Sequence, residues 1–146
     1  MKSNSAKSSS LRPVVIIGPT ASGKSCAALS LYQALGGGGI VNADAFQVYR
    51  QLSIGVARPN VDEVARAPHY LFGYLDCFPR IFNASSYRDS VDQLLSVPEY
   101  WIDGPPIFVG GSLFYVKALF FKLASVDVDI DGSRIIRPLG LRDWEY

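Results

Sequence analysis

The sequence predicts one α/β domain in which helices flank a parallel β-sheet, and three observations lead to this prediction. With 146 residues, 49% of them hydrophobic, the chain is long enough for one compact core. Short apolar runs alternate along it with helical patterns, as in βαβ units with right-handed crossovers. The first run, "PVVIIG", leads directly into the glycine-rich stretch "GPTASGKS", which is the usual context of a phosphate-binding loop (P-loop).

The first strand and helix are predicted from their apolar patterns. "PVVIIG" has no polar face, so we expect a strand that is buried on both sides. A helix follows, and the four-glycine run that begins at Gly36 ends it. Its inward stripe is expected to consist of Ala28, Leu31, Tyr32 and Leu35.

The later elements continue the alternation. "GIVNAD" and "YLFGYLD" are predicted as the second and third strands, and "PPIFVGG" as another buried strand. A helix is predicted between "YLFGYLD" and "PPIFVGG". Asn83 or Ser85 could cap its start, and Pro98 closes it. The last predicted helix runs from Ser112 to Ala124. The inward stripe of the middle helix consists of Tyr87, Val91, Leu94 and Leu95.

The two ends of the chain carry no such pattern. Residues 1–10 are mostly serine and lysine and are expected to form a disordered tail. Residues 125–146 lack periodicity and contain Gly132, Pro138 and Gly140 as breakers, which indicates an irregular C-terminal tail. The P-loop catalytic core is therefore predicted at residues 11–124.

Charge and cysteine content indicate which ligands and which cellular environment suit the protein. The net charge of +1, from 14 basic and 13 acidic residues, gives no strong attraction to nucleic acid, although the segment before Asp44 contains no acid and suits an anionic ligand. Cys26 and Cys77 lack metal-type spacing, so we expect a reduced, cytoplasmic protein without a disulfide. The apolar runs are shorter than the roughly 20 residues that span a bilayer.

Residues 18–25 carry the strongest motif of the chain. "GPTASGKS" fits the Walker A pattern G-x-x-x-x-G-K-[ST], in which backbone N–H groups wrap a phosphate. Lys24 would reach the outer phosphates, and Ser25 would offer its hydroxyl to Mg²⁺. The motif indicates the class of ligand and leaves the reaction open.

Asp44 comes at the end of the second predicted strand. The carboxyl ends of parallel strands border the ligand crevice, so this side chain could be a metal ligand, a general base or a helix N-cap. The following residues Gln47, Tyr49 and Arg50 could hold a base or a phosphate, or belong to a solvated loop. "PPIFVGG" ends in two glycines instead of a Walker B aspartate, which favours group transfer over a plain ATPase.

Four other features receive structural interpretations. "DVDIDG" resembles the start of a calcium-binding EF-hand loop, but its twelfth position is Pro138 instead of glutamate, so calcium is rejected. His69 is the only histidine and is expected to be a packed or hydrogen-bonded side chain at the start of the third strand. Cys26 is expected to be a small core residue. The aromatic side chains near the last helix are expected to serve the core and partner packing.

Several segments together resemble one family, the tRNA dimethylallyltransferases or tRNA isopentenyltransferases. "GPTASGKS" is followed by "VNADAFQVYRQLSIGVARP", which is similar to the family block S-A-D-S-x-Q-V-Y-x-x-L-x-I-G-T-A-K-P. "APHYLFGYLD", "ASSYRDSV" and "PPIFVGGSLFYVKAL" are similar to later family segments. A P-loop alone is shared by many proteins, whereas this ordered set is specific.

The resemblance implies transfer of a dimethylallyl group from dimethylallyl diphosphate to the exocyclic amine of the adenosine 3′ of a tRNA anticodon. It implies that Asp44 accepts the proton of the attacking amine and that Thr20 aligns this amine. It also implies that Mg²⁺ is bound through Ser25. The residues that would contact tRNA are Asp44, Ala45, Phe46, Gln47 and Ser112. The diphosphate would be bound by Gly18, Pro19, Thr20, Ala21, Ser22, Gly23, Lys24 and Ser25.

The chain also departs from the family pattern. Ala45 and Ser112 stand where serine and threonine are usual, and the helical half that grips the anticodon arm is expected to be missing. We therefore expect a monomer that carries the N-terminal catalytic half, truncated relative to the family. Two alternatives remain, a P-loop small-molecule or nucleotide kinase and a non-catalytic remnant that binds diphosphate.

Overall fold

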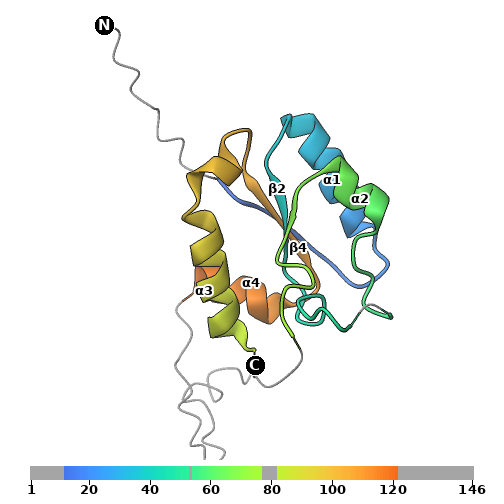
Figure 1. Cartoon of the computed structure of the whole chain (residues 1–146), viewed down its shortest axis with the longest axis vertical. Coiled ribbons are helices and arrows are strands. Elements are labelled where there is room, and N and C mark those ends of the chain that lie inside the picture. Colours follow the sequence, from blue (N-terminus) through green and yellow to red (C-terminus); the bar gives the residue numbers. More distant parts are fainter. Residues whose placement is uncertain (1–11, 53, 77–81, 122–146) are drawn as a thin grey trace, which may run out of the picture.

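A four-stranded parallel sheet forms the centre of the protein. The computed structural model describes residues 12–52, 54–76 and 82–121. Within them, the strands lie in the order β1-β4-β2-β3, and every pair is parallel. This confirms the predicted fold class (Figure 1). The strands are β1 (Val14–Ile17), β2 (Gly39–Asn42), β3 (His69–Tyr70) and β4 (Pro106–Gly110).

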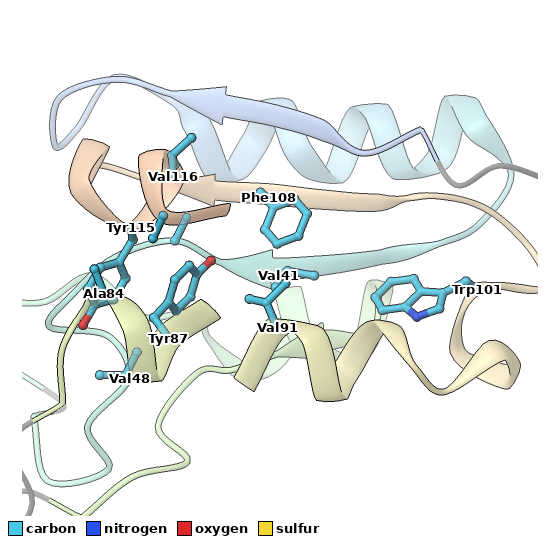
Figure 2. Packing of buried hydrophobic residues seen from close by; sticks show 11 residues of the cluster. Val41, Val48, Ala84, Tyr87, Val91, Trp101, Phe108, Tyr115 and Val116 are labelled. Atoms are coloured by element: carbon cyan, nitrogen blue, oxygen red, sulfur yellow. The ribbon is translucent and has the colours of Figure 1, made fainter. Parts of the chain in front are cut away.

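Helices cover both faces of the sheet (Figure 1). Along β2 and β4, Ile40 pairs with Ile107 and Val41 with Phe108. Because neighbouring side chains of a strand point to opposite faces, the two pairs belong to different clusters. The first pair packs with α1. The second pair packs with α3 and α4 (Figure 2). The helices are α1 (Lys24–Leu35), α2 (Val61–Arg66), α3 (Ala84–Leu95), the 3₁₀ helix η1 (Pro98–Trp101) and α4 (Leu113–Phe120).

The first strand is less buried than the sequence predicts. In β1, Val14, Val15 and Ile16 are half-buried, and Ile17 is 46% exposed. Within the described residues β1 pairs with β4 alone and forms an edge of the sheet. The prediction of a strand buried on both sides is therefore wrong for this element.

The first helix ends where predicted and packs most of the predicted stripe, since Ala28 is buried and Leu31 and Tyr32 pack against the same cluster. The backbone N–H groups of Gly36 and Gly37 donate to the carbonyl groups of Gln33 and Tyr32, and Gly36 has a left-handed φ of 75°, as in a Schellman motif. Ala28 and Leu29 are its buried residues, whereas Leu35 is 43% exposed. The expected place of Leu35 in the stripe is wrong because the helix packs on the sheet through its middle.

The third strand is shorter than predicted and a helix precedes it. Leu71 has a positive φ of 62°, which turns the chain away after Tyr70, so "YLFGYLD" does not continue as a strand. The helix α2 was not predicted from the sequence. Its signal is the capping box in which Asn60 and Glu63 exchange side-chain to backbone hydrogen bonds.

The last two helices largely agree with the sequence. Tyr87 and Val91 of α3 are buried, and Asn83, not Ser85, caps the helix by accepting from the Ser86 N–H at 3.0 Å. In α4 the helix ends at Phe120, and Phe121 is extended, so the predicted end at Ala124 is wrong. Residues 122–124, both predicted tails and Cys77 lie outside the described residues.

Side-chain exposure corrects two further expectations. Cys26 is exposed, so it is not the core residue that was expected, because it lies in the first turn of α1 before the buried middle of the helix. The aromatic residues of α4 divide, since Tyr115 is buried while Phe114 and Phe120 are 67% and 53% exposed. No helix in the described part of the chain has the length and apolar character needed to cross a membrane.

Candidate active site

The Walker A stretch forms a tight loop between β1 and α1. A Cβ atom at Gly18 would lie 2.9 Å from the Ser22 Oγ atom, so the loop closes around this glycine. Ala21 and Gly23 have left-handed φ angles of 62° and 81°. These conformations reverse the chain within a few residues and bring it to Lys24, the first residue of α1.

The beginning of α1 is suited to an anion. Gly23 offers no side-chain cap, and the first turn of α1 contains no acidic residue. The first N–H groups of a helix have no partner within the helix, and the helix dipole favours negative charge at this end. Lys24 adds a positive charge, and its Nζ donates to the Pro19 carbonyl at 2.5 Å, so its ammonium group lies across the loop. The loop therefore has the geometry of a phosphate site.

Asp44 follows β2 and lies at the same edge of the sheet. The Phe46 N–H donates to its Oδ1 at 2.9 Å, so one carboxylate oxygen caps the following turn. Its Oδ2 lies 3.7 Å from the position that a Cβ atom at Gly111 would take. No helix begins here, so Asp44 caps a turn instead of the start of a helix, and it also lines a pocket shared with the P-loop.

One pocket of about 420 Å³ joins the two segments. Of the residues predicted for the site, those that line it are Thr20, Ala21, Ser22, Gly23, Lys24, Ser25, Asp44, Phe46 and Gln47. Gly18, Pro19, Ala45 and Ser112 are not among its lining residues. Apolar side chains that the sequence analysis did not assign to a site complete the wall: Ile40, Val56, Phe72 and Val109. The pocket thus combines a polar phosphate end with apolar surface.

Gln47 and Ser112 have structural roles beside their predicted contacts with tRNA. The Gln47 Nε2 donates to the Val56 carbonyl at 2.7 Å and so holds the loop that closes one side of the pocket. The Ser112 Oγ accepts from the Ala45 N–H at 2.8 Å. The Gln47 bond spans nine residues of the chain, whereas the Ser112 bond connects the segment after Asp44 to a part of the chain 67 residues away. Their contacts with tRNA stay predictions.

His69 is packed and hydrogen-bonded, as expected, and it also lines the pocket. As predicted, it begins the third strand, and its ring packs edge-on against Phe72 with centroids 5.5 Å apart. Its Nδ1 is 2.8 Å from the Ala67 carbonyl oxygen, which requires a proton on Nδ1. In a neutral ring the Nε2 atom is then an acceptor.

Two stacked tyrosines lie close to the segment that contains Asp44. The rings of Tyr87 and Tyr115 are 4.4 Å apart and nearly parallel, and the Tyr87 hydroxyl donates to the Asn42 carbonyl at 2.7 Å (Figure 2). Burial raises the pKa of both phenols above the ordinary value of 10.0, and the nearby Asp44 charge raises the pKa of Tyr115 further. Both side chains therefore stay neutral around neutral pH.

The residues at the loop fit a magnesium ion that a phosphate ligand brings with it. Residues 12–52, 54–76 and 82–121 contain no group of three or more His, Cys, Asp or Glu side chains able to hold a metal ion. Mg²⁺, however, often takes only one or two ligands from the protein and the rest from phosphate and water. Ser25 lines the pocket within the phosphate loop, and a hydroxyl is suited to such a contact.

Fold and site together define a P-loop α/β protein, and comparison with known proteins identifies its family. A sequence model described as IPP transferase matches residues 47–138, which is more than half of the chain. The chain belongs to the IPP transferase family.

Curated relatives and solved structures agree with this assignment. The chain is 43% identical over 126 residues to a tRNA dimethylallyltransferase of Sphingopyxis alaskensis, covering 86% of this chain and 40% of the relative. A Rhodopseudomonas palustris tRNA dimethylallyltransferase is 45% identical over 115 residues, with coverage of 79% and 34%.

Among solved structures, the tRNA isopentenylpyrophosphate transferase of Bacillus halodurans has a TM-score of 0.67 and 32% identity, and the match covers 82% of this chain and 39% of that one. The chain thus spans about two fifths of the length of these relatives.

Proposed function

We propose that the protein transfers a dimethylallyl group from dimethylallyl diphosphate to the N6 amine of the adenosine 3′ of the anticodon in tRNA. The observation that carries this proposal is the shared pocket of the Walker A loop and the Asp44 carboxylate. Membership of the IPP transferase family supports it, as do relatives named tRNA dimethylallyltransferase. The substrates would be tRNA, bound at its anticodon loop, and dimethylallyl diphosphate.

In this proposal the loop binds the leaving group. The backbone N–H groups near Ala21, Ser22 and Gly23, together with Lys24, would stabilise the charge that develops on the diphosphate as its bond to the allylic carbon breaks. Mg²⁺ would neutralise part of the same charge, and the Ser25 hydroxyl is the protein group suited to hold it. The apolar wall of the pocket would surround the hydrocarbon group.

Asp44 would act on the other substrate. The adenine N6 atom forms a bond to the allylic carbon and loses a proton, which Asp44 would accept as a general base. Thr20 lines the same pocket and would align the amine. Gln47 and Phe46 line the pocket beside Asp44 and would contact an unstacked base, the usual target of single-strand RNA recognition.

The test is to incubate the 146-residue chain with Mg²⁺, labelled dimethylallyl diphosphate and unmodified tRNA and to look for prenylated adenosine by nucleoside mass spectrometry. The Bacillus halodurans relative serves as positive control. Labelled adenosine supports the proposal. If the folded chain binds the diphosphate but forms no product, the proposal fails and the remnant alternative stands.

The Asp44→Asn variant tests whether Asp44 acts in the chemical step while the loop binds the diphosphate. We expect it to lower transfer by at least about a hundredfold while diphosphate affinity changes by less than about twofold, because the base acts only in the chemical step. Isothermal titration with dimethylallyl diphosphate measures binding separately from transfer. An equal loss of both quantities contradicts the assignment. Tighter binding of ATP than of the allylic diphosphate, together with phosphate transfer, would instead favour a kinase.

A further inference from the structure

Asn42 is the one buried polar side chain in the described core. It ends β2, between the buried apolar residues Val41 and Ala43, and is itself fully buried, at 0% exposure. A buried amide without hydrogen-bond partners would be destabilising. Its partners therefore indicate why a polar residue occupies this place.

Both polar atoms of the Asn42 side chain form hydrogen bonds with the backbone of Asp44. Its Oδ1 accepts from the Asp44 N–H at 2.9 Å, and its Nδ2 donates to the Asp44 carbonyl at 3.1 Å. The same Nδ2 donates to the Leu71 carbonyl at 3.0 Å, which joins the segment to the turn after β3. All three bonds end on backbone groups, so they restrain the course of the main chain at Asp44.

Further contacts hold Asn42 and the residue after Asp44. The hydroxyl of Tyr87 donates to the Asn42 carbonyl at 2.7 Å and points from α3 toward β2 (Figure 2). On the far side of Asp44, the Ala45 N–H donates to the Ser112 Oγ at 2.8 Å. Asp44 therefore lies between two anchored residues, while its own carboxylate lines the pocket.

We propose that Asn42 is a positioning residue that holds the Asp44 carboxylate against the P-loop. This proposal rests on the proposed function, in which Asp44 accepts a proton and must lie within hydrogen-bond reach of the reacting amine. An apolar residue at position 42 would fill the core but leave both backbone groups of Asp44 and the Leu71 carbonyl without their present partner. Asn42 itself does not line the pocket, so it would act only through Asp44.

The test compares Asn42→Ala with a matched control in the full 146-residue chain. Tyr74→Phe is the control, because it also removes a half-buried hydrogen bond, from the Tyr74 hydroxyl to the Ser90 Oγ, but away from the pocket. We expect Asn42→Ala to lower kcat for transfer by about tenfold or more and to change the Kd for dimethylallyl diphosphate by less than about twofold. Tyr74→Phe should change neither quantity by more than about twofold.

A merely structural role predicts a different result. In that case Asn42→Ala and Tyr74→Phe would lower kcat alike, or kcat and diphosphate affinity would fall together, and either result overturns the proposal. Melting curves identify the temperature range in which each variant is folded, and the kinetic measurements stay within that range.

A second measurement does not depend on transfer. Amide hydrogen exchange, followed by NMR, should be faster by about tenfold or more at the Asp44 N–H of Asn42→Ala, while the Ala45 N–H, which Ser112 holds, changes by less than about threefold. Unchanged exchange at Asp44 overturns the proposal. If the wild-type chain transfers nothing, the proposed function fails, and the exchange pattern alone decides whether Asn42 positions Asp44.

Discussion

Lys24 shows at the scale of a single residue how the loop is prepared for an anion. Its ammonium group lies against the Pro19 carbonyl, within a loop whose backbone already reverses at Ala21 and Gly23. A phosphate in the pocket would meet a positive charge and unpaired helix N–H groups at the same place. The side chain therefore needs little rearrangement to reach a ligand.

We predict that Lys24→Met lowers affinity for dimethylallyl diphosphate by at least about tenfold, because a hydrogen bond to a charged group is worth about 1.5–3 kcal/mol. Isothermal titration calorimetry measures the effect. The control is Arg66→Met, which removes the same charge from an exposed position at the end of α2, outside the pocket. A similar loss in both variants would show that overall charge, not the loop, determines binding.

At the scale of elements, the helix α3 stabilises the strand end that precedes Asp44. It carries Tyr87, whose hydroxyl holds the end of β2, and it begins at the Asn83 cap. Asn83 and Ser85 were alternative caps from the sequence, and it is Asn83 that accepts a hydrogen bond from the first turn. The start of the helix, and hence the place of Tyr87, depends on this side chain.

Removal of the cap should be measurable in unfolding experiments. We expect Asn83→Ala to lower the free energy of unfolding by about 1 kcal/mol, the usual effect of losing an N-cap. Ser85→Ala, on the exposed side of the same turn, should change it by less than about 0.5 kcal/mol. Urea unfolding followed by circular dichroism compares the two. Equal effects would contradict the assignment of the cap.

At the scale of the whole molecule, the buried tyrosines link stability to pH. Burial raises the pKa of Tyr87 above 10.0 in the folded state, whereas the unfolded chain has the ordinary value. The folded state therefore holds this proton more tightly. Its stabilising effect is complete below pH 10 and is lost as the pH rises above it.

We predict that the free energy of unfolding falls above pH 10, with a contribution from Tyr87 of up to about 1.4 kcal/mol per pH unit. Urea unfolding between about pH 9 and pH 11.5 measures the slope, and Tyr87→Phe should show a smaller one. Parallel curves for Tyr87→Phe and the wild type would show that ionisation of this phenol is not the cause.

Local patterns were sufficient for much of the fold. The Walker A loop, the β4 strand and the buried stripe of α3 all depend on residues close together in the chain, so spacing and residue type identify them. The same holds for Asp44 at the end of β2, because parallel strands bring their carboxyl ends to one edge. Even α2, which was not predicted, has a local signal in its capping box.

Contacts between distant residues required the tertiary structure. The strand order places β1 at an edge of the described sheet and leaves it partly exposed, which its uniformly apolar sequence does not indicate. The bonds that hold the Asp44 segment join Asn42 to Leu71, 29 residues away, and Ala45 to Ser112, 67 residues away. Such hydrogen bonds depend on how the strands assemble. The periodicity of one segment does not indicate which distant backbone group will bind to a buried amide.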